Sequence, residues 1–333
     1  MNVSDLSFRA LLLTRPDDTN IASVVELHER DLPAGDVLVR VKYSTVNYKD
    51  GMAISGNAHR QVVQFFPFVP GVDFSGVVVS SQSADYRPGD EVILNGWGVG
   101  EKHWGGFAEL ARVRSEWLVP LPKGMTLKQA MAHGSAGLSA MLCINALEKH
   151  GIDKDKDVLV TGASGGVGSV ALMLLKKLGY RAVGSSGRPE HTDYMLSLGA
   201  DRVVDRESIS ALPETPLLDE RWGAVIDNVG GTTLSNALAS MAYGGAIASL
   251  GLVGGRDLST TVLPFIMRAV ALIGVNSVYC SKEDRVHAWN RLAELLPDGL
   301  PGDVIHEISL EEVPERALDI IKGGVRGRTI VVL

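Results

Sequence analysis

Apolar and polar residues alternate along several short stretches in the first third of the chain. Residues 36–44 alternate in this way, residues 74–81 are rich in β-branched side chains, and residues 90–94 follow a Pro-Gly-Asp turn. Alternation with a period of two is typical of strands that bury one face. The pattern therefore predicts a β-rich first domain.

From about residue 126 the apolar positions change to helical spacing, and predicted helices separate short apolar strands. Strands and helices that alternate in this way predict βαβ units in a parallel, doubly wound sheet. The tail adds a helix and an edge strand. The helices are predicted at residues 127–131, 137–149, 167–178, 189–198, 232–241 and 282–296, and the strands at 157–161, 181–184, 202–204, 224–226, 246–250 and 329–333.

Length and charge narrow the possible classes of protein. The chain has 333 residues, enough for two domains that each bury an apolar core. Hydrophobic residues make up 45% and charged residues 21%, which are globular proportions. The formal net charge of −7 provides no broad positive field. We therefore expect neither nucleic acid nor an anionic membrane as a main partner.

The N-terminal segment and the cysteines favour a cytoplasmic protein. The segment lacks the apolar stretch of a signal peptide, and no run of about 18 apolar residues follows it. Cys143 and Cys280 lie far apart in the sequence, which excludes a disulfide framework and a CxxC-type zinc site. Cys143 belongs to an apolar helical run and is interpreted as a core residue.

A glycine-rich turn, GASGGVG at residues 162–168, follows a predicted strand and opens a predicted helix. Gly162 allows a tight exit from the strand, and Gly165 and Gly166 allow the backbone to approach a pyrophosphate. Gly168 allows the helix to pack closely, with its first N–H groups facing the anion. The turn predicts a dinucleotide site. Its GxxGxxG spacing is a variant, and a turn without a ligand is the alternative.

The next predicted strand ends in SSGR at residues 185–188, without an acidic residue. An NAD enzyme places Asp or Glu here to bind the ribose 2′-hydroxyl. Two hydroxyl groups and Arg188 suit a 2′-phosphate instead, and a charge-assisted contact is worth about 1.5–3 kcal/mol. The strand end predicts NADPH as the cofactor, with Arg188 as an ordinary surface residue as the alternative. Arg202, at the start of the following strand, is a further candidate for the phosphate.

The same turn also satisfies the G-x-S-x-G nucleophile elbow of α/β-hydrolases, with Ser164 as the nucleophile. Asp227 and His306 follow in the chain order of such a triad. Gly168 and the SSGR strand end have no role in a hydrolase, so we keep this function only as an alternative.

Three segments resemble the medium-chain dehydrogenase/reductase superfamily, quinone-oxidoreductase branch: STVNYKD at 44–50, PFVPGVDFSG at 67–76 and the glycine turn. The likeness covers nearly the whole chain. GWGVGEKHWGG at 96–106 and PFIMR at 264–268 look like the NADPH-dependent acryloyl-CoA reductases. The resemblance implies an α/β fold with a GroES-like β-rich catalytic domain at residues 1–128 and 279–333, and a Rossmann domain, a doubly wound parallel sheet, at 129–278.

The resemblance also implies an enzyme without zinc. Zinc alcohol dehydrogenases of this superfamily carry Cys and Gly-His-Glu at the catalytic metal, and this chain has Asn47 and Gly-Val-Asp at residues 71–73 in those places. Asn and Val do not bind zinc. The lobe that elsewhere carries four cysteines has none here. Hydrogen-bond donors, and no metal, are therefore expected to polarise the substrate.

The activity implied by resemblance is hydride transfer from NADPH to the β-carbon of acryloyl-CoA, which gives propanoyl-CoA after protonation of the α-carbon. Asn47 and Tyr48 are the candidate catalytic donors for the oxyanion that develops on the thioester oxygen. Tyr48 can equally form a wall beside the nicotinamide, and solvent can supply the proton.

The resemblance further implies a set of contacts to NADPH, in which Leu252 and Ile266 have a structural role as the alternative. It also implies a homodimer that pairs through the apolar run 269–275, which could instead lie in the interior. The implied cofactor-binding residues are Tyr48, Ser164, Gly165, Gly166, Val167, Ser186, Gly187, Arg188, Arg202, Leu252, Ile266, Ser277 and Arg328.

Two other functions stay open for the same residues. A general NADPH quinone or enone reductase would use the same cofactor site on a different small-molecule substrate. A non-catalytic NADPH-binding protein is the other, because binding motifs do not prove turnover. The acyl-CoA preference depends on the resemblance alone, with Arg60, Lys102 and His103 as the candidates for the CoA phosphates.

Overall fold

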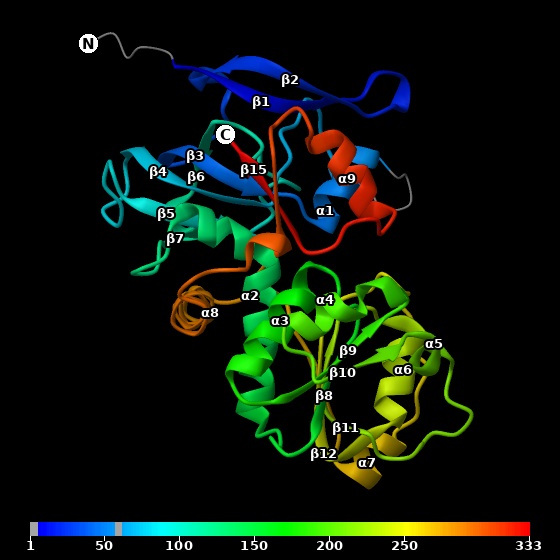
Figure 1. The fold of residues 1–333 in the computed structure, drawn as a ribbon. Helices are drawn as coiled ribbons and strands as arrows, with labels where there is room; N and C mark the ends of the chain where they lie inside the picture. Colours follow the sequence, from blue (N-terminus) through cyan, green and yellow to red (C-terminus); the bar gives the residue numbers. More distant parts are fainter. Residues whose placement is uncertain (1–5, 57–61) are drawn as a thin grey trace. The chain divides into compact units, whose positions relative to one another are not determined.

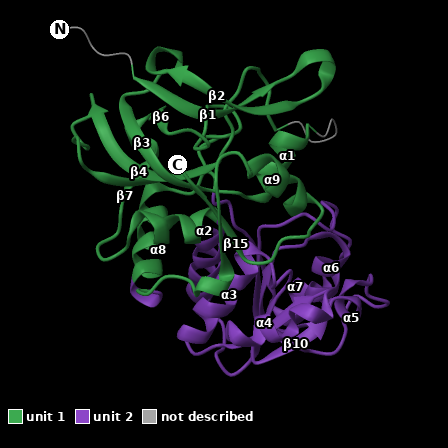
Figure 2. Ribbon diagram, turned by 45° about the horizontal axis from the view of Figure 1, so that its top comes forward, with its two compact units in different colours: residues 1–135, 278–293, 297–333 green, residues 136–277, 294–296 purple. Residues whose placement is uncertain are grey.

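The computed structural model describes residues 6–56 and 62–333, and the chain divides into two compact units (Figures 1 and 2). Unit 1 comprises residues 1–135, 278–293 and 297–333, and unit 2 comprises residues 136–277 and 294–296. The sequence suggested boundaries after residues 128 and 278.

Unit 1 is built on a seven-stranded sheet and a separate two-stranded hairpin, β1 with β2. The sheet order is β14-β15-β3-β4-β5-β7, and β6 also pairs with β3. All pairs are antiparallel except β14 with β15. The strands are β1 (Ser7–Thr14), β2 (Ile21–His28), β3 (Val37–Thr45), β4 (Asp73–Ser81), β5 (Glu91–Asn95), β6 (Leu110–Val113), β7 (Leu118–Pro120), β14 (Ile305–Ile308) and β15 (Arg328–Val332). The α-helices are α1 (Tyr48–Ser55), α8 (Lys282–Leu295) and α9 (Val313–Ile321), and the 3₁₀ turns are η1 (Pro16–Asp18), η2 (Glu29–Asp31), η4 (Ser115–Trp117) and η6 (Gly302–Val304).

The alternation in β3 produces one core of unit 1, because Val37, Val39 and Val41 all point to the same buried face. A second core lies where α1 packs against α9. An added Cβ at Gly51 would come within 2.6 Å of the Ala317 carbonyl oxygen, so only glycine permits this approach. The close packing fixes α1, which carries a candidate catalytic residue in its first turn.

Unit 2 is a six-stranded parallel sheet in the order β10-β9-β8-β11-β12-β13, with intervening helices (Figure 1). The prediction of a doubly wound Rossmann-type sheet is confirmed. The strands are β8 (Asp157–Val160), β9 (Arg181–Ser186), β10 (Arg202–Asp205), β11 (Trp222–Asp227), β12 (Met241–Ser249) and β13 (Ala271–Gly274). The helices are α3 (Gly166–Lys177), α4 (Thr192–Ser197), α5 (Glu207–Ser210), α6 (Gly231–Ala239) and α7 (Leu263–Arg268), with the 3₁₀ turn η5 (Pro189–His191).

The helices predicted at 127–131 and 137–149 are confirmed as the two parts of α2 (Leu127–His150), which non-helical backbone at Gly134 separates. The prediction of an edge strand at residues 329–333 is wrong. The strand β15 is not at an edge, because it lies between β14 and β3. Its neighbour β14 has only four residues, and so short a segment leaves a weak periodic signal. The apolar run 269–275 does contain an edge strand, β13.

Helix α2 is long and apolar enough to cross a membrane by length and composition alone. Among residues 6–56 and 62–333 it alone passes that test, with a mean hydropathy of 1.2 over its most apolar window. Of that window 83% is buried inside the protein, as in the core helix of a globular fold. Cys143, on this helix, is fully buried, which confirms its interpretation as a core residue.

Candidate functional site

The glycine turn joins β8 to α3 in unit 2 (Figure 1). Gly162 has a φ of +58°, in the left-handed region that favours glycine. An added Cβ at Gly168 would lie 2.5 Å from the Ala163 Cα, so the helix can approach the turn only with glycine there. Gly165 is the N-cap of α3, whose first N–H groups have no partner within the helix. This geometry fits a pyrophosphate, because the open donors and the helix dipole both favour an anion.

The turn also lies where the order of the sheet changes direction. Strands β9 and β10 continue from β8 on one side, and β11, β12 and β13 on the other. In open α/β sheets dinucleotides bind at the carboxyl edge of this switch point. The topology therefore supports the same site as the turn itself.

Polar side chains gather beside the turn, at the carboxyl ends of β9 and β10. The Ser186 Oγ lies 3.4 Å from the Ser164 Oγ and accepts a hydrogen bond of 3.1 Å from the Arg188 backbone N–H. Arg206 follows β10, and its backbone N–H donates to the Ser186 carbonyl oxygen at 3.1 Å. The Arg206 guanidinium lies against Gly187, where an added Cβ would come 2.6 Å from Cζ. The Ser186 hydroxyl and the Arg206 guanidinium thus fit a 2′-phosphate, with Arg188 close to Ser186 in the sequence.

The structure corrects the expectation for Arg202, which does not join this cluster. Arg202 begins β10, at the edge of the sheet opposite to Arg206. Its guanidinium donates to Asp157 Oδ2 at 2.7 Å and stacks over the Trp222 ring at 5.5 Å. Sequence reasoning missed Arg206 because it placed the end of β10 too early, at residue 204. The pairing register of the structure shows the position of Arg206, which directly follows Asp205, the partner of Ser186.

The other cofactor residues expected in unit 2 stay predictions. Leu252 follows β12 at the carboxyl edge of the sheet and is 48% exposed, and Ile266 on α7 is 68% exposed. The Ser277 Oγ accepts a hydrogen bond of 2.8 Å from the Ser139 Oγ.

In unit 1, the ends of three neighbouring strands bring buried polar side chains together. The Asp73 carboxylate accepts hydrogen bonds from the side-chain amides of Asn47 and Asn95, each at 3.0 Å. The Ser135 backbone N–H also donates to it, at 2.7 Å. The α2 kink permits this contact: Gly134 has a φ of +52°, and an added Cβ would lie 2.8 Å from Asp73 Oδ2. No pattern in the sequence identified Asp73 as the centre of a network.

The same network corrects the role expected for Asn47. One hydrogen of its amide is directed to Asp73, and the other to the Thr45 carbonyl oxygen at 3.3 Å. Its Oδ1 accepts a hydrogen bond of 3.2 Å from Arg328 Nη1. Because a carboxylate needs a donor and a guanidinium needs an acceptor, these partners fix the amide orientation. Asn47 has no N–H left for an oxyanion and is therefore a positioning residue.

Arg328 was expected to contact the cofactor, but its guanidinium is buried in unit 1 and donates hydrogen bonds to protein atoms there. It is only 3% exposed. Its Nε donates to the Ala132 carbonyl oxygen at 2.9 Å, and its Nη2 donates to Thr45 Oγ1 at 2.8 Å. With the bond to Asn47, every nitrogen has a protein partner. Arg328 therefore holds Asn47 in place.

Tyr48 is the first residue of α1 and remains the candidate donor at this edge. Asp50 caps that helix: Oδ2 accepts from the Asn47 backbone N–H at 2.8 Å, and Oδ1 accepts from the Val72 backbone N–H at 3.0 Å. Burial raises the pKa of Asp50 to about 7, helped by the nearby Asp73 charge and opposed by these two hydrogen bonds. Asp50 was not among the expected site residues.

The residues at the superfamily's zinc position are bonded to one another. Asn47 donates to Asp73, and Val72 offers only its backbone N–H, to Asp50. Among residues 6–56 and 62–333, no group of three or more His, Cys, Asp or Glu side chains is placed to hold a metal ion.

The hydrolase alternative has no general base beside its nucleophile within unit 2. The nearest recorded partner of Ser164 Oγ is Ser186, not a histidine. The Asp227 carboxylate accepts hydrogen bonds from Thr161 and from the backbone N–H groups of Val229 and Gly230. It therefore organises the loop after β11 rather than an imidazole.

Of the candidates for the CoA phosphates, Arg60 lies outside the described residues. The two ring nitrogens of His103 lie 2.9 Å from the Trp104 carbonyl oxygen and 3.3 Å from that of Ala34, as in a loop-fixing residue. Lys102 lies beside Gly98 and stays a prediction.

Comparison with known proteins agrees with this arrangement. Residues 33–123 match the family model for the alcohol dehydrogenase GroES-like domain, and residues 166–296 match that for zinc-binding dehydrogenases. The chain is 46% identical over 327 residues to the acrylyl-CoA reductase AcuI of Ruegeria pomeroyi, covering 97% of this chain and 98% of the relative. It is 42% identical to the putative quinone oxidoreductase YhfP of Bacillus subtilis, covering 98% and 99%.

A solved structure shows the same fold. The yhdH oxidoreductase of Salmonella enterica, solved in complex with NADP, superimposes with a TM-score of 0.93 at 47% identity, covering 98% of this chain and 99% of that one. Full-length identity at this level, the two domain matches and the geometry of both units agree. The chain belongs to the acrylyl-CoA reductase family of the medium-chain dehydrogenase/reductase superfamily.

Proposed function

We propose that this protein is a zinc-independent, NADPH-dependent oxidoreductase that reduces the activated C=C bond of acryloyl-CoA to give propanoyl-CoA. The choice of NADPH as the cofactor is supported by Ser186, Arg188 and Arg206, which end or follow the strands beside the glycine turn. The substrate is supported by the near full-length likeness to the acrylyl-CoA reductase of Ruegeria pomeroyi.

Bound NADPH supplies the hydride for the β-carbon of the acryloyl group. Negative charge then develops on the thioester oxygen, and the Tyr48 hydroxyl is the donor that this chain offers to it. Arg328 and Asp73 hold Asn47 rigid, and Asp50 holds the backbone N–H of Asn47 at the start of α1. Because Tyr48 directly follows Asn47 in the sequence, these contacts also fix the position of the Tyr48 backbone. The α-carbon takes a proton from solvent.

The acceptor can be tested by following the loss of NADPH with acryloyl-CoA, with a short quinone and with no acceptor. We expect turnover with acryloyl-CoA. Turnover only with the quinone would assign the general quinone reductase that the 42% likeness to a putative quinone oxidoreductase favours. No turnover with any acceptor would favour a non-catalytic NADPH-binding protein.

Tyr48→Phe should lower the turnover number, because the phenol donor for the thioester oxygen is lost. An unchanged turnover number would show that the hydroxyl has no role in the chemistry.

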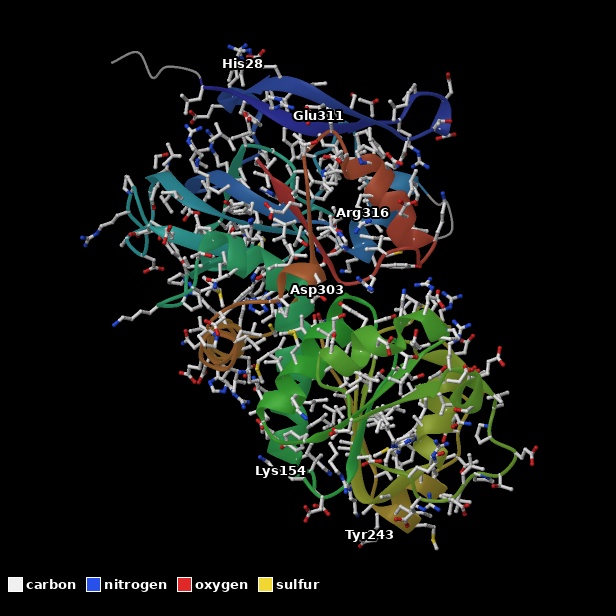
Figure 3. The ribbon with its side chains drawn as sticks, in the orientation of Figure 1. His28, Lys154, Tyr243, Asp303, Glu311 and Arg316 are labelled. Carbon is white, nitrogen blue, oxygen red and sulfur yellow. The ribbon has the colours of Figure 1, made fainter. Side chains whose placement is uncertain are left out.

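We also propose a homodimer that pairs through β13. This strand ends the sheet of unit 2 and is bonded only to β12. Beside it, Ile266 and Met267 on α7 are 68% and 60% exposed, and Tyr243 is 66% exposed near the same helix (Figure 3). An open strand edge next to exposed apolar side chains is typical of an association surface.

A further inference from the structure

The loop that follows β5 holds a tryptophan in a costly backbone conformation. Trp97 has a φ of +56°, between Gly96 at +75° and Gly98 at +78°. A bulky residue in the left-handed region costs about 1–3 kcal/mol, which a third glycine would avoid. Such strained conformations are often found at functional sites, so we ask what the Trp97 indole contributes.

The indole is clamped rather than loosely exposed. The Arg285 guanidinium lies over its ring at 5.1 Å, and the Tyr279 ring meets it edge-on at 6.4 Å. Arg285 is itself fully buried and donates to the carbonyl oxygens of Asn95 and Val278. Arg285 therefore holds the Trp97 indole of the aromatic wall that Trp97 and Tyr279 form, and Tyr279 itself is 54% exposed.

One hydrogen-bond donor of this wall lacks an acceptor among the described residues. The Trp97 Nε1 is buried, and it has no hydrogen-bond partner among the residues that the structure describes. Buried donors without a partner are rare and are often completed by a ligand or water. The indole thus combines an apolar ring that is partly buried with one N–H that has no partner among the described residues.

Two sets of contacts connect the wall to the edge that carries Tyr48. Asp73 accepts hydrogen bonds from both Asn47 and Asn95, and Trp97 follows Asn95 by two residues, at most roughly 7 Å of chain. The Lys49 Nζ, one residue after Tyr48, donates to Glu101 of the same loop at 2.8 Å. The wall and the candidate donor thus lie on the same side of unit 1.

We propose that Trp97 is a specificity-determining residue that bounds the acyl group of the acceptor and admits only short 2-enoyl thioesters. The inference rests on the proposed function. A clamped indole cannot withdraw from a longer chain, because its backbone, Arg285 and Tyr279 all oppose movement. One methylene in an apolar pocket changes selectivity by about 10- to 200-fold. The wall therefore selects acryloyl-CoA over crotonyl-CoA.

The test compares kcat/KM for crotonyl-CoA and acryloyl-CoA in the wild type, Trp97→Leu and Trp97→Phe. Both substitutions keep a side chain at a left-handed position, so the backbone cost changes little. We expect the crotonyl-to-acryloyl ratio to rise at least about tenfold in Trp97→Leu. Trp97→Phe keeps a ring beneath Arg285 and should show a smaller rise, which protects the test if the leucine variant fails to fold.

Trp117 provides the matched control, because it is also partly buried, lies beneath Arg114 at 5.4 Å and meets the His103 ring edge-on at 5.1 Å. Trp117→Leu should leave the ratio unchanged, and the affinity for NADPH should be unchanged in all variants. An unchanged ratio in both Trp97 variants, with a wild type that reduces acryloyl-CoA, would overturn this inference alone. A wild type inactive on acryloyl-CoA would overturn the proposed function and the inference with it.

Discussion

The Arg206 guanidinium lies against Gly187 at the end of β9, where sequence reasoning identified only Arg188. Arg206 reaches the same place from the neighbouring strand, because parallel strands end at a common edge. A phosphate dianion there would meet the Ser186 hydroxyl and the Arg206 guanidinium. We therefore expect Arg206 to contribute to NADPH selectivity together with Arg188.

The first prediction concerns these residues. Arg206→Ala should raise the Kd for NADPH about 10- to 100-fold, because a charge-assisted hydrogen bond contributes about 1.5–3 kcal/mol. The Kd for NADH should hardly change, since NADH lacks the 2′-phosphate. Fluorescence titration with both cofactors measures this. Arg202→Ala is the matched control from the same strand, and an equal loss of NADPH affinity in that variant would contradict the assignment.

A second prediction concerns the buried carboxyl Asp50. Its pKa is raised to about 7 in the folded protein from an ordinary value of 3.8, chiefly by burial. The folded state thus binds the proton more tightly than the unfolded state, so this contribution to stability is present at low pH and is lost as the pH rises toward 7. Its slope approaches about 1.4 kcal/mol per pH unit for one proton.

Asp50→Asn should remove that slope. Urea denaturation between pH 5 and pH 8 would show the free energy of unfolding of the wild type falling relative to the variant as the pH rises. Asp31→Asn is the control, because Asp31 also accepts a hydrogen bond from a backbone N–H three residues earlier, His28, but lies at the surface. Parallel profiles for wild type and Asp50→Asn would refute the assignment.

At the scale of elements, close backbone approaches decide how the site is built. The start of α3 touches the glycine turn, α1 touches α9, and the kink in α2 meets Asp73. Each of these contacts has a glycine where a side chain would overlap backbone or buried polar atoms. The glycines therefore determine where whole helices lie.

The third prediction follows for Gly168→Ala. The new Cβ would lie 2.5 Å from the Ala163 Cα and the Gly162 carbonyl oxygen, so α3 must move away from the turn. We expect a loss of about 1–3 kcal/mol in stability and a marked loss of NADPH affinity. Thermal unfolding and cofactor titration measure the two effects. Gly302→Ala, where a Cβ meets nothing within 4 Å, should leave both almost unchanged.

At the scale of the whole molecule, the open edge of β13 leads to the fourth prediction. Leu272→Lys places a charge on this edge strand and should shift a dimer toward monomer. Sedimentation velocity over a range of protein concentrations would measure the shift. Lys177→Glu, a charge change on the exposed side of α3, should not alter the mass. A wild type that is monomeric at all concentrations would contradict the proposed dimer.

The sequence by itself determined the class of fold and the kind of cofactor. Alternation in β3 and helical spacing after residue 126 are local signals, because side-chain direction follows directly from the period of the backbone. The glycine turn and the SSGR strand end are equally local. NADPH was therefore readable from residues 162–188 without tertiary structure.

Only the tertiary structure decided which polar residues act together. Arg206 rather than Arg202 joins Ser186 because pairing register places one at each end of the same short strand. Asn47 has no free N–H because Asp73 and Arg328, 26 and 281 positions away, occupy its amide. Such contacts depend on how distant segments pack, and no pattern along the chain records them. Local patterns in the sequence therefore predict the elements and the cofactor, whereas the contacts between polar side chains depend on the tertiary structure.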